Sequence, residues 1–193
     1  MQLELNLIKQ ALLKSEWTVR VVAHRDALAF IEAHHYARGA SNTSTFAFGL
    51  FRNSEPEVLM GALLWMPPIR NAAKSINPTA PAKVLALSRM AVHPWVPRNA
   101  CSFMLSRAAR IIRRDRRYNV LVAYSDSMMR HTGAVYGACG WVHTFTSKPY
   151  PAWLDSQGQL VCKKATVTRR HAWMDARYQR VGPYVKYRWV RRL

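Results

Sequence analysis

The feature that most constrains the fold is the stretch of residues 84–141, in which strand-like and helix-like patterns alternate. Residues 84–92 form a mostly apolar run with β-branched ends, which predicts a strand, and Pro94 prevents it from continuing. Residues 119–124 predict a second buried strand, which ends at the polar pair 125–126. Strands that alternate with helices indicate a βαβ unit with a right-handed crossover. The carboxyl ends of both strands then meet at one edge of the sheet, where ligands bind in open α/β sheets.

Two helices are predicted within this unit. Asn99 is placed to cap the first helix, in which apolar residues from Cys101 to Ile112 recur at helical spacing and arginines fall on the opposite side. The second helix covers residues 131–139 and ends at Gly140. We expect the edge of the sheet to present four polar side chains at one rim, namely Arg89, His93, Ser125 and Asp126.

The rest of the chain predicts a mixed sheet around the βαβ unit. Further strands are expected over residues 17–23, 46–51, 58–65, 142–146 and 184–190, and the second and third of these form a hairpin. Helices are expected over residues 1–14, 26–35 and 169–180, with Asp26 as the cap of the second. Residues 70–83 are expected to be a long irregular connection, a kind of segment that is often functional. This order predicts a single α/β domain over residues 1–193, with a mixed, partly antiparallel sheet, helices on both faces and a basic C-terminal segment.

The charge balance indicates polyanionic partners. The chain has 29 Lys and Arg residues against 10 Asp and Glu residues, a formal net charge of +19, and such a field attracts polyanions. Nucleic acid is the first candidate, and a membrane surface is disfavoured because no long Lys-rich amphipathic helix is present. No run of about 18 apolar residues exists, so no membrane span is expected. The N-terminus lacks the basic start of a secretory signal, and three cysteines without metal-like spacing indicate free thiols in a reducing compartment.

Groups of basic residues, interleaved with aromatic ones, are candidate nucleic-acid contacts. Runs of charge are usually solvated faces, but this number of unbalanced cations favours DNA or RNA binding. The candidates lie on the central helix, at the C-terminus and on the long connection: Arg107, Arg110, Arg114, Arg188, Arg191, Arg192, Arg70 and Lys74.

The polar residues at the strand ends suit acid–base chemistry. Asp126 could orient or deprotonate an amine nucleophile, although a carboxylate at this place also suits an N-cap or an Asx turn. Arg89 lies in an otherwise apolar strand, so it must be paired or must face a ligand. A phosphate or carboxylate ligand and a structural ion pair with Asp126 both remain open, and the two are compatible.

The end of the first long helix supplies a second candidate group. The helical phase places His34 toward the core and His35 away from it, so His35 and Tyr36 are the candidates for a site. Tyr36 could stack on a base or donate a hydrogen bond to a developing oxyanion. A helix C-terminus that favours a partly cationic histidine is the alternative. No second cluster of ligands accompanies these histidines, so no metal site is predicted.

These residues also carry a resemblance to a known family. Four segments resemble the Mom family of phage DNA-modification proteins: Leu-Ser-Arg-Met-Ala-Val at 87–92, Ser-Phe-Met-Leu-Ser at 102–106, Ala-Tyr-Ser-Asp at 123–126 and His-Thr-Gly-Ala-Val-Tyr-Gly-Ala-Cys-Gly-Trp at 131–141. The match extends upstream to His34-His35-Tyr36 and downstream to Lys186-Tyr187-Arg188-Trp189. That family in turn resembles the GNAT acyltransferases, which implies a GNAT-like fold for this chain.

The resemblance implies a phage enzyme, located in the host bacterial cytoplasm, that modifies the N6 amino group of adenine in double-stranded DNA. The group added would be of the carbamoylmethyl (glycinamide) type, and it would protect phage DNA from host restriction. Six catalytic residues are implied: Asp126 as base or orienter, Arg89 and Ser125 as contacts to the donor carbonyl or a phosphate, Tyr36 and His35 as residues that hold the base or polarise the carbonyl, and Tyr136, which is either core or reaches the cleft. Two other functions remain open: GNAT-type N-acyl transfer to a protein or small amine, and nucleic-acid binding without catalysis.

The donor is expected at the loop before the central helix. The GNAT enzymes that this chain resembles have a glycine-rich loop at this place, which holds the pyrophosphate of coenzyme A against a helix N-terminus. This loop contains no glycine, so the close backbone approach is missing and acetyl-CoA is the less favoured donor. Arg98, Asn99 and Ser102 are candidates for binding an anionic donor. The family chemistry implies an activated two-carbon donor, for which glycyl-tRNA is a candidate, so tRNA is a candidate second partner.

Overall fold

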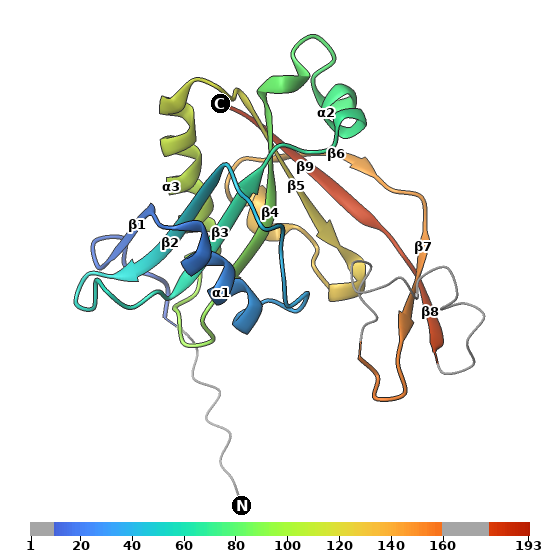
Figure 1. The fold of residues 1–193 in the computed structure, drawn as a ribbon, viewed down its shortest axis with the longest axis horizontal. Coiled ribbons are helices and arrows are strands. Elements are labelled where there is room, and N and C mark those ends of the chain that lie inside the picture. The colour runs from blue at the N-terminus through green and yellow to red at the C-terminus, as the bar shows by residue number, and fades with distance from the viewer. Residues whose placement is uncertain (1–9, 160–177) are drawn as a thin grey trace, which may run out of the picture.

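The computed structural model describes residues 10–159 and 178–193, and a seven-stranded sheet lies at its centre (Figure 1). The order across the sheet is β1 (Trp17–Val21), β2 (Phe46–Arg52), β3 (Gly61–Met66), β4 (Val84–Val92), β5 (Val120–Asp126), β9 (Lys186–Arg192) and β6 (Val142–Thr146). β4 and β5 pair in parallel, and all other neighbouring strands among these described residues pair antiparallel. The mixed sheet and the predicted hairpin are therefore confirmed.

Helices cover both faces of the sheet, as the sequence predicted. They are α1 (His24–His34), α2 (Arg70–Ile76), α3 (Ala100–Asp115) and α4 (Ala134–Gly137), with turns of 3-10 helix at Pro81–Lys83 and Ser127–Met129. Successive side chains of a strand point to opposite faces. Leu121 of β5 packs in the hydrophobic cluster that contains α3, and Val122 packs in the cluster that contains α2. Leu63 and Leu64 of β3 likewise divide between the α3 and α1 clusters, so α1 and α2 share the face opposite α3.

The two parallel strands diverge toward their carboxyl ends. β4 and β5 pair only where Val84–Ala86 lies opposite Val120–Val122, so a gap opens beyond that point. Further along β4, a β-bulge separates Leu87 from Arg89, which pairs with Leu64. A bulge adds one residue to a strand, and it therefore changes the face to which the following side chains point. Arg89 thus faces α1 and α2, whereas Leu87 packs with the α3 cluster.

Several predicted elements need correction. Residues 70–76 form α2 rather than an irregular connection, because two of its side chains bury against the sheet. α1 begins at His24, so Asp26 lies in its first turn and does not cap it. Asn99 does precede α3, but its backbone is left-handed (φ 67°) and its side chain makes no capping hydrogen bond.

The region after β5 is also less helical than predicted. The helix expected over residues 131–139 shrinks to α4, because Gly133 adopts a left-handed conformation (φ 84°) and interrupts the chain before it. β7 (Tyr150–Leu154) and β8 (Gln179–Tyr184) form a two-stranded ribbon that leads into β9 (Figure 1).

Two predicted helices lie mainly outside the described residues. Residues 10–14 are not helical, and residues 1–9 lie outside the described part of the chain. The predicted helix over residues 169–180 likewise falls outside it up to residue 177, and its last two residues belong to β8. In the part of the chain that the structure describes, no helix combines the length and the apolar character needed to cross a membrane.

Candidate active site between helices α1 and α2

A cavity of about 560 Å³ lies on the face of α1 and α2, above the gap between the diverging strands. Its volume falls in the range of about 300–1,000 Å³ that is usual for small-molecule sites. The end of α1, the loop before α2, the middle of β4 and the end of β5 line it. Five of the six candidate catalytic residues meet here, namely His35, Tyr36, Arg89, Asp126 and Tyr136.

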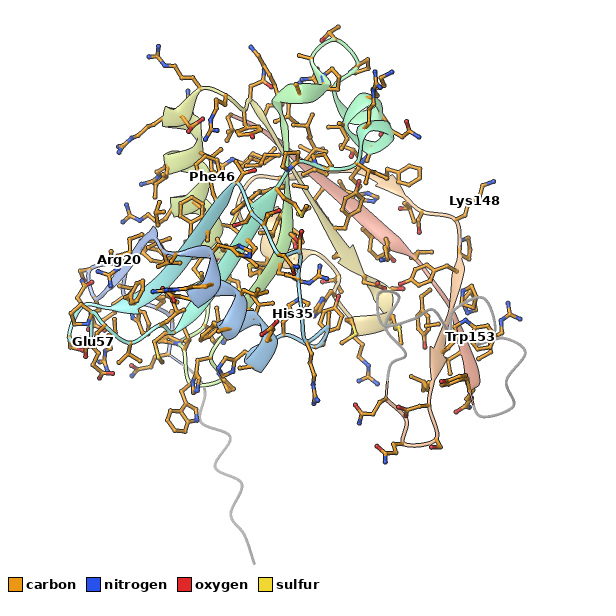
Figure 2. The ribbon with its side chains drawn as sticks, viewed as in Figure 1. Arg20, His35, Phe46, Glu57, Lys148 and Trp153 are labelled. Carbon is orange, nitrogen blue, oxygen red and sulfur yellow. The ribbon has the colours of Figure 1, made fainter. Side chains whose placement is uncertain are left out.

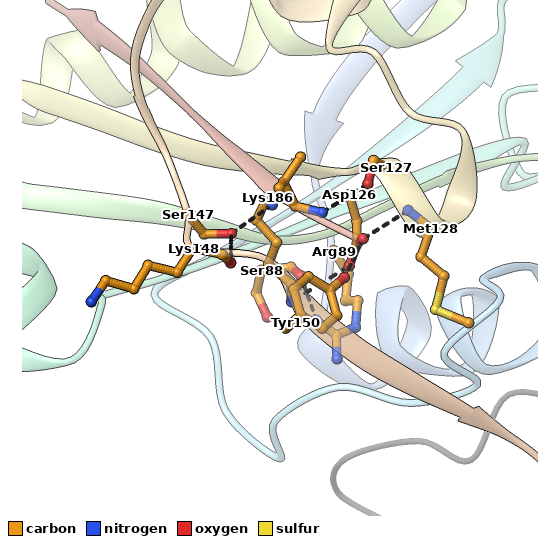
Figure 3. Close-up of polar contacts among 10 residues, drawn as sticks. Ser88, Arg89, Asp126, Ser127, Met128, Ser147, Lys148, Tyr150 and Lys186 are labelled. Atoms are coloured by element: carbon orange, nitrogen blue, oxygen red, sulfur yellow. Dashed lines mark hydrogen bonds and ion pairs between the residues drawn. The ribbon is translucent and has the colours of Figure 1, made fainter. Parts of the chain in front are cut away.

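Asp126 ends β5, and its carboxylate has partners on several sides (Figure 3). Its Oδ1 accepts hydrogen bonds from the backbone N–H of Met128, at 3.0 Å, and from the hydroxyl of Tyr150. Its Oδ2 lies 3.5 Å from the Nζ of Lys186. The Met128 contact is the capping role that the sequence left open. A carboxylate oxygen has more than one lone pair, so Oδ2 can still accept a hydrogen bond from a ligand.

Tyr150 and Lys186 are site residues that sequence analysis missed. Tyr150 stands 24 positions from Asp126 and reaches it because the β7–β8 ribbon returns beside the sheet. Lys186 pairs with Asp126 across the β5–β9 ladder, and its Nζ lies 5.5 Å from the centre of the Tyr150 ring. Burial and donation to Asp126 raise the pKa of the Tyr150 hydroxyl, so it remains a donor at neutral pH. No local pattern signals these contacts, since both depend on strand order.

His35 lies just after the C-terminal end of α1, near the middle of the molecule in Figure 2. Burial, the charge of Arg89 and the nearby His131 lower the pKa of its imidazole from 6.5 to about 4, so the ring is neutral at pH 7. Its Nδ1 accepts a hydrogen bond from the backbone N–H of Ala37 at 3.0 Å, which places the ring proton on Nε2. His35 is therefore a neutral donor, so the alternative of a partly cationic histidine does not hold for His35.

The predicted environment of His34 is also wrong. Its side chain is exposed, and its ring packs on Phe30 and His93 with centroid distances of 4.3 and 5.2 Å. His93 therefore lies beside the end of α1 and does not line the cavity. The rim expected from the sequence is thus divided, because His93 packs beside His34 whereas Asp126 lines the cavity.

Arg89 contributes positive charge to the cavity without pairing with Asp126. Its Nε donates to the carbonyl of Gly39 at 2.8 Å, and an Nη donates to the carbonyl of Ser88 at 2.7 Å. Asp126 pairs instead with Lys186, so the structural ion pair that the sequence left open does not form. A guanidinium carries five N–H donors, and those that remain can meet an anionic or carbonyl ligand.

Ser125 lies on the other side of the sheet, because neighbouring residues of a strand point to opposite faces. It is 2% exposed and accepts a hydrogen bond from Nε1 of Trp189 at 3.0 Å. Its side chain lines a second cavity, of about 380 Å³, together with Cys101 of α3. Met90, His131 and Tyr136 line both cavities, so the two lie next to each other. Burial raises the pKa of the Tyr136 hydroxyl, which is therefore protonated at neutral pH.

The three candidate donor-binding residues lie at the start of α3. Arg98 and Asn99 are exposed, and the hydroxyl of Ser102 donates to the carbonyl of Asn99 at 2.9 Å. None of the three lines either cavity, whereas Cys101 of the same turn does. Binding of a donor by this turn stays a prediction.

The candidate nucleic-acid contacts divide between the two faces. Arg70 and Lys74 are exposed on α2, beside the first cavity. The α3 candidates lie on the opposite face: Arg107, Arg110 and Arg114.

Two of the C-terminal arginines have partners within the protein. Arg188 donates to Ser75 at 2.9 Å and to Thr144 at 3.1 Å, and an Nη of Arg191 donates to the carbonyl of Cys139 at 3.1 Å. Arg192 is exposed. Arg191 and Arg192 are neighbours in β9, so they face opposite sides of the sheet.

Large apolar surfaces are exposed around the mouth of the first cavity. Tyr36 and Tyr124, both of which line it, are 47% and 41% exposed. Ile69, in the loop before α2, also lines it and is 78% exposed. Exposed rings beside a carboxylate and a neutral histidine suit a flat heterocycle that carries an amino group, because its face can stack and its edge can form hydrogen bonds.

Comparisons with known proteins bear on the family and the fold. The model of the Mom protein family matches residues 16–191. The comparison with curated protein sequences found no match.

Solved structures of acetyltransferases are similar to most of the chain. They include spermidine N-acetyltransferase from Vibrio cholerae, in complex with CoA and spermine (TM-score 0.53, 12% identity, 92% of this chain and 96% of that chain). The ribosomal-protein-S5-alanine acetyltransferase from Vibrio fischeri is similar over 92% of this chain and 93% of its own (TM-score 0.54, 11% identity). A GNAT-family acetyltransferase from Streptococcus pneumoniae is similar over 92% and 99% (TM-score 0.54, 9% identity). At such low identity the likeness shows the fold, which is that of the GNAT acetyltransferases.

Proposed function

Because the chain belongs to the Mom protein family, we propose that it is a transferase that modifies the N6 amino group of adenine in DNA with a carbamoylmethyl-type group. The observation that carries the proposal is the cavity between α1 and α2, in which a carboxylate, a neutral histidine and exposed aromatic rings converge. The net charge of +19 supports a polyanionic substrate. Protection of phage DNA from host restriction would be the biological effect.

The target adenine would leave the stack and enter the cavity. Enzymes that act on a base in duplex DNA extrude it into a pocket and hold it by stacking and by hydrogen bonds to its edge. Tyr36 and Tyr124 would supply the stacking surfaces, and the volume of about 560 Å³ suits a base with part of its sugar. Arg70 and Lys74 beside the mouth would contact the flanking phosphates.

The chemistry would need help from the protein because the lone pair of adenine N6 is delocalised into the ring. In the step proposed, N6 attacks the ester carbonyl carbon of a glycyl donor, the bond to the ribose oxygen of the tRNA breaks, and a proton passes from N6 to Asp126. The glycyl amine would then attack C6 of the ring and the original C6–N6 bond would break, which converts the N6-glycyl adduct into its carbamoylmethyl isomer. Lys186 and Tyr150 would hold the carboxylate in place. His35, with its proton on Nε2, would donate to a ring nitrogen of adenine or to the donor carbonyl.

The donor would approach from the α3 face. The second cavity shares Met90, His131 and Tyr136 with the first, so a donor held there would lie close to the adenine. An activated two-carbon donor such as glycyl-tRNA fits this proposal, and Arg107, Arg110 and Arg114 on α3 would then contact its phosphates. Acetyl-CoA is less favoured, since the loop before α3 lacks the glycines that let a backbone approach a pyrophosphate.

Nucleoside mass spectrometry of DNA from bacteria that express the protein tests the function directly. We expect a new adenine adduct in cells with the wild-type protein and with Asp115→Asn, whose carboxylate pairs with Arg117 at the end of α3. Asp126→Asn, which keeps the shape but removes the base, should lower the adduct by at least about a hundredfold, the usual contribution of a general base. Unmodified adenine in wild-type cells would refute the proposal.

The likeness to GNAT acetyltransferases favours one rival function, N-acyl transfer to a protein or small amine. That function requires coenzyme A binding, so titration calorimetry with acetyl-CoA discriminates the two. Binding at micromolar concentration together with unmodified DNA would favour the rival. DNA binding without any adduct and without coenzyme A binding would instead indicate a non-catalytic binding protein.

A further inference from the structure

The loop between β3 and α2 carries an apolar side chain that is mostly exposed to solvent. Ile69 is 78% exposed, although it stands at the edge of a cavity. A free isoleucine side chain in water gains nothing for stability, since the hydrophobic effect rewards only the area that is removed from water. Tyr36 and Tyr124 at the same mouth are more buried.

The backbone that carries Ile69 is restrained on both sides. Pro67 and Pro68 precede it, and each proline ring fixes one backbone angle. On the other side, the carbonyl of Ile69 accepts a hydrogen bond from the N–H of Ala73 at 3.0 Å, which ties it to the first turn of α2. α2 is in turn held by the burial of Ile76 and the other apolar side chain that faces the sheet.

The charges around Ile69 fit the backbone of a duplex. Arg70 follows it directly, and Lys74 lies one turn further along α2, both exposed. Arg188 of β9 holds the same helix through its hydrogen bond to Ser75 at 2.9 Å. Ile69 thus lies at the edge of a base-sized cavity and is followed by two cations. Proteins that insert an apolar side chain between base pairs have the same combination, because their cations hold the phosphates.

We propose that Ile69 is a wedge that enters the DNA duplex and fills the space left by the adenine as the base moves into the cavity. The proposal rests on the proposed function, since it needs a base that leaves the stack. Ile69 is the residue suited to this task because it is aliphatic, without a polar atom, and rigidly mounted beside the opening. The two tyrosines that line the wall would stack on the extruded base instead.

The test uses 2-aminopurine, an adenine analogue whose fluorescence rises when it leaves the stack. Duplexes would take their sequence from a site that carries the adduct in DNA of expressing cells, with 2-aminopurine in place of the target adenine. The full-length variants are Ile69→Ala, Ile69→Leu and, as the matched control, Leu13→Ala, which removes an isomeric side chain that is 60% exposed and lines neither cavity. Circular dichroism verifies that each variant is folded.

At saturating protein, wild type, Ile69→Leu and Leu13→Ala should extrude the base equally, and Ile69→Ala should shift the equilibrium toward the stacked state by roughly tenfold. With 2-aminopurine opposite an abasic site, where unstacking is already easy, Ile69→Ala should match wild type. Equal fluorescence for Ile69→Ala and wild type on the paired duplex overturns the proposal, and so does an equal loss on both duplexes. If wild-type cells contain no adenine adduct, the proposed function fails instead, and that result is separate from either outcome.

Discussion

Gly133 is the position where a single methyl group should do most damage to the site. An added Cβ would lie 2.3 Å from two ring carbons of Trp189, and the backbone there has φ 84°, a conformation that L-residues avoid. The ring of Trp189 packs on Tyr136, at 6.0 Å between centroids, and its Nε1 donates to Ser125. To relieve the overlap the indole must move by about 1 Å, which breaks this packing on the α3 side of the sheet.

The expected cost of Gly133→Ala combines three effects. A left-handed alanine costs about 1–2 kcal/mol, overpacking typically about 1–3 kcal/mol and a lost hydrogen bond about 1 kcal/mol. We therefore expect a loss of about 3–6 kcal/mol in the free energy of unfolding, a large part of the roughly 5–15 kcal/mol of an ordinary domain. With a slope of about 4 kcal/mol/M, the guanidinium midpoint should fall by about 1 M.

Gly137→Ala is the matched control. Gly137 ends α4, and a Cβ there would meet no atom within 4 Å. Because alanine restricts the unfolded chain more than glycine does, the free energy of unfolding of this variant should equal that of the wild type or exceed it by up to about 1 kcal/mol. Guanidinium unfolding followed by far-ultraviolet circular dichroism measures both. A loss below about 1 kcal/mol for Gly133→Ala would show that the indole is free to move and would refute the reasoning.

Three further predictions follow from the site and the sheet. The NMR titration of His35 should show a pKa near 4, and Arg89→Met should raise it only in part, because burial is the larger cause and remains. Because the unfolded chain binds more protons between about pH 4 and 6.5, the contribution of His35 to stability should increase with pH across that window and be lost below it. A wild-type pKa above 6 would contradict this. Tyr150→Phe removes the hydroxyl that donates a hydrogen bond to Asp126. We therefore expect about 1 kcal/mol lower stability in urea unfolding and less adduct in the nucleoside assay. Wild-type values in both measurements would exclude a positioning role for Tyr150. Arg191→Ala should lower stability by about 1 kcal/mol, because it removes the hydrogen bond to Cys139. Arg192 is exposed, so Arg192→Ala should leave stability within about 0.5 kcal/mol and instead reduce the salt dependence of DNA binding. The reverse pattern would contradict the faces of the sheet assigned to these two side chains.

The sequence was sufficient for the elements whose patterns are local. The strand at residues 84–92 and the following helix are where apolar spacing predicted them, because burial on one side imposes a period of two or 3.6 residues on the chain itself. Arg89 and Asp126, expected at one edge of the sheet from the rule on strand ends, do line one cavity. The roles of these side chains in catalysis remain predictions.

The tertiary structure alone decided which side chains share a cavity. One bulge turns Arg89 toward α1, and a one-residue step sends Ser125 to the opposite face from Asp126. The side-chain partners of Asp126 come from β7 and β9, which lie beside it only in the folded sheet. Periodicity records whether a position is buried, but register and strand order determine what it meets, and those depend on contacts between segments far apart in the chain.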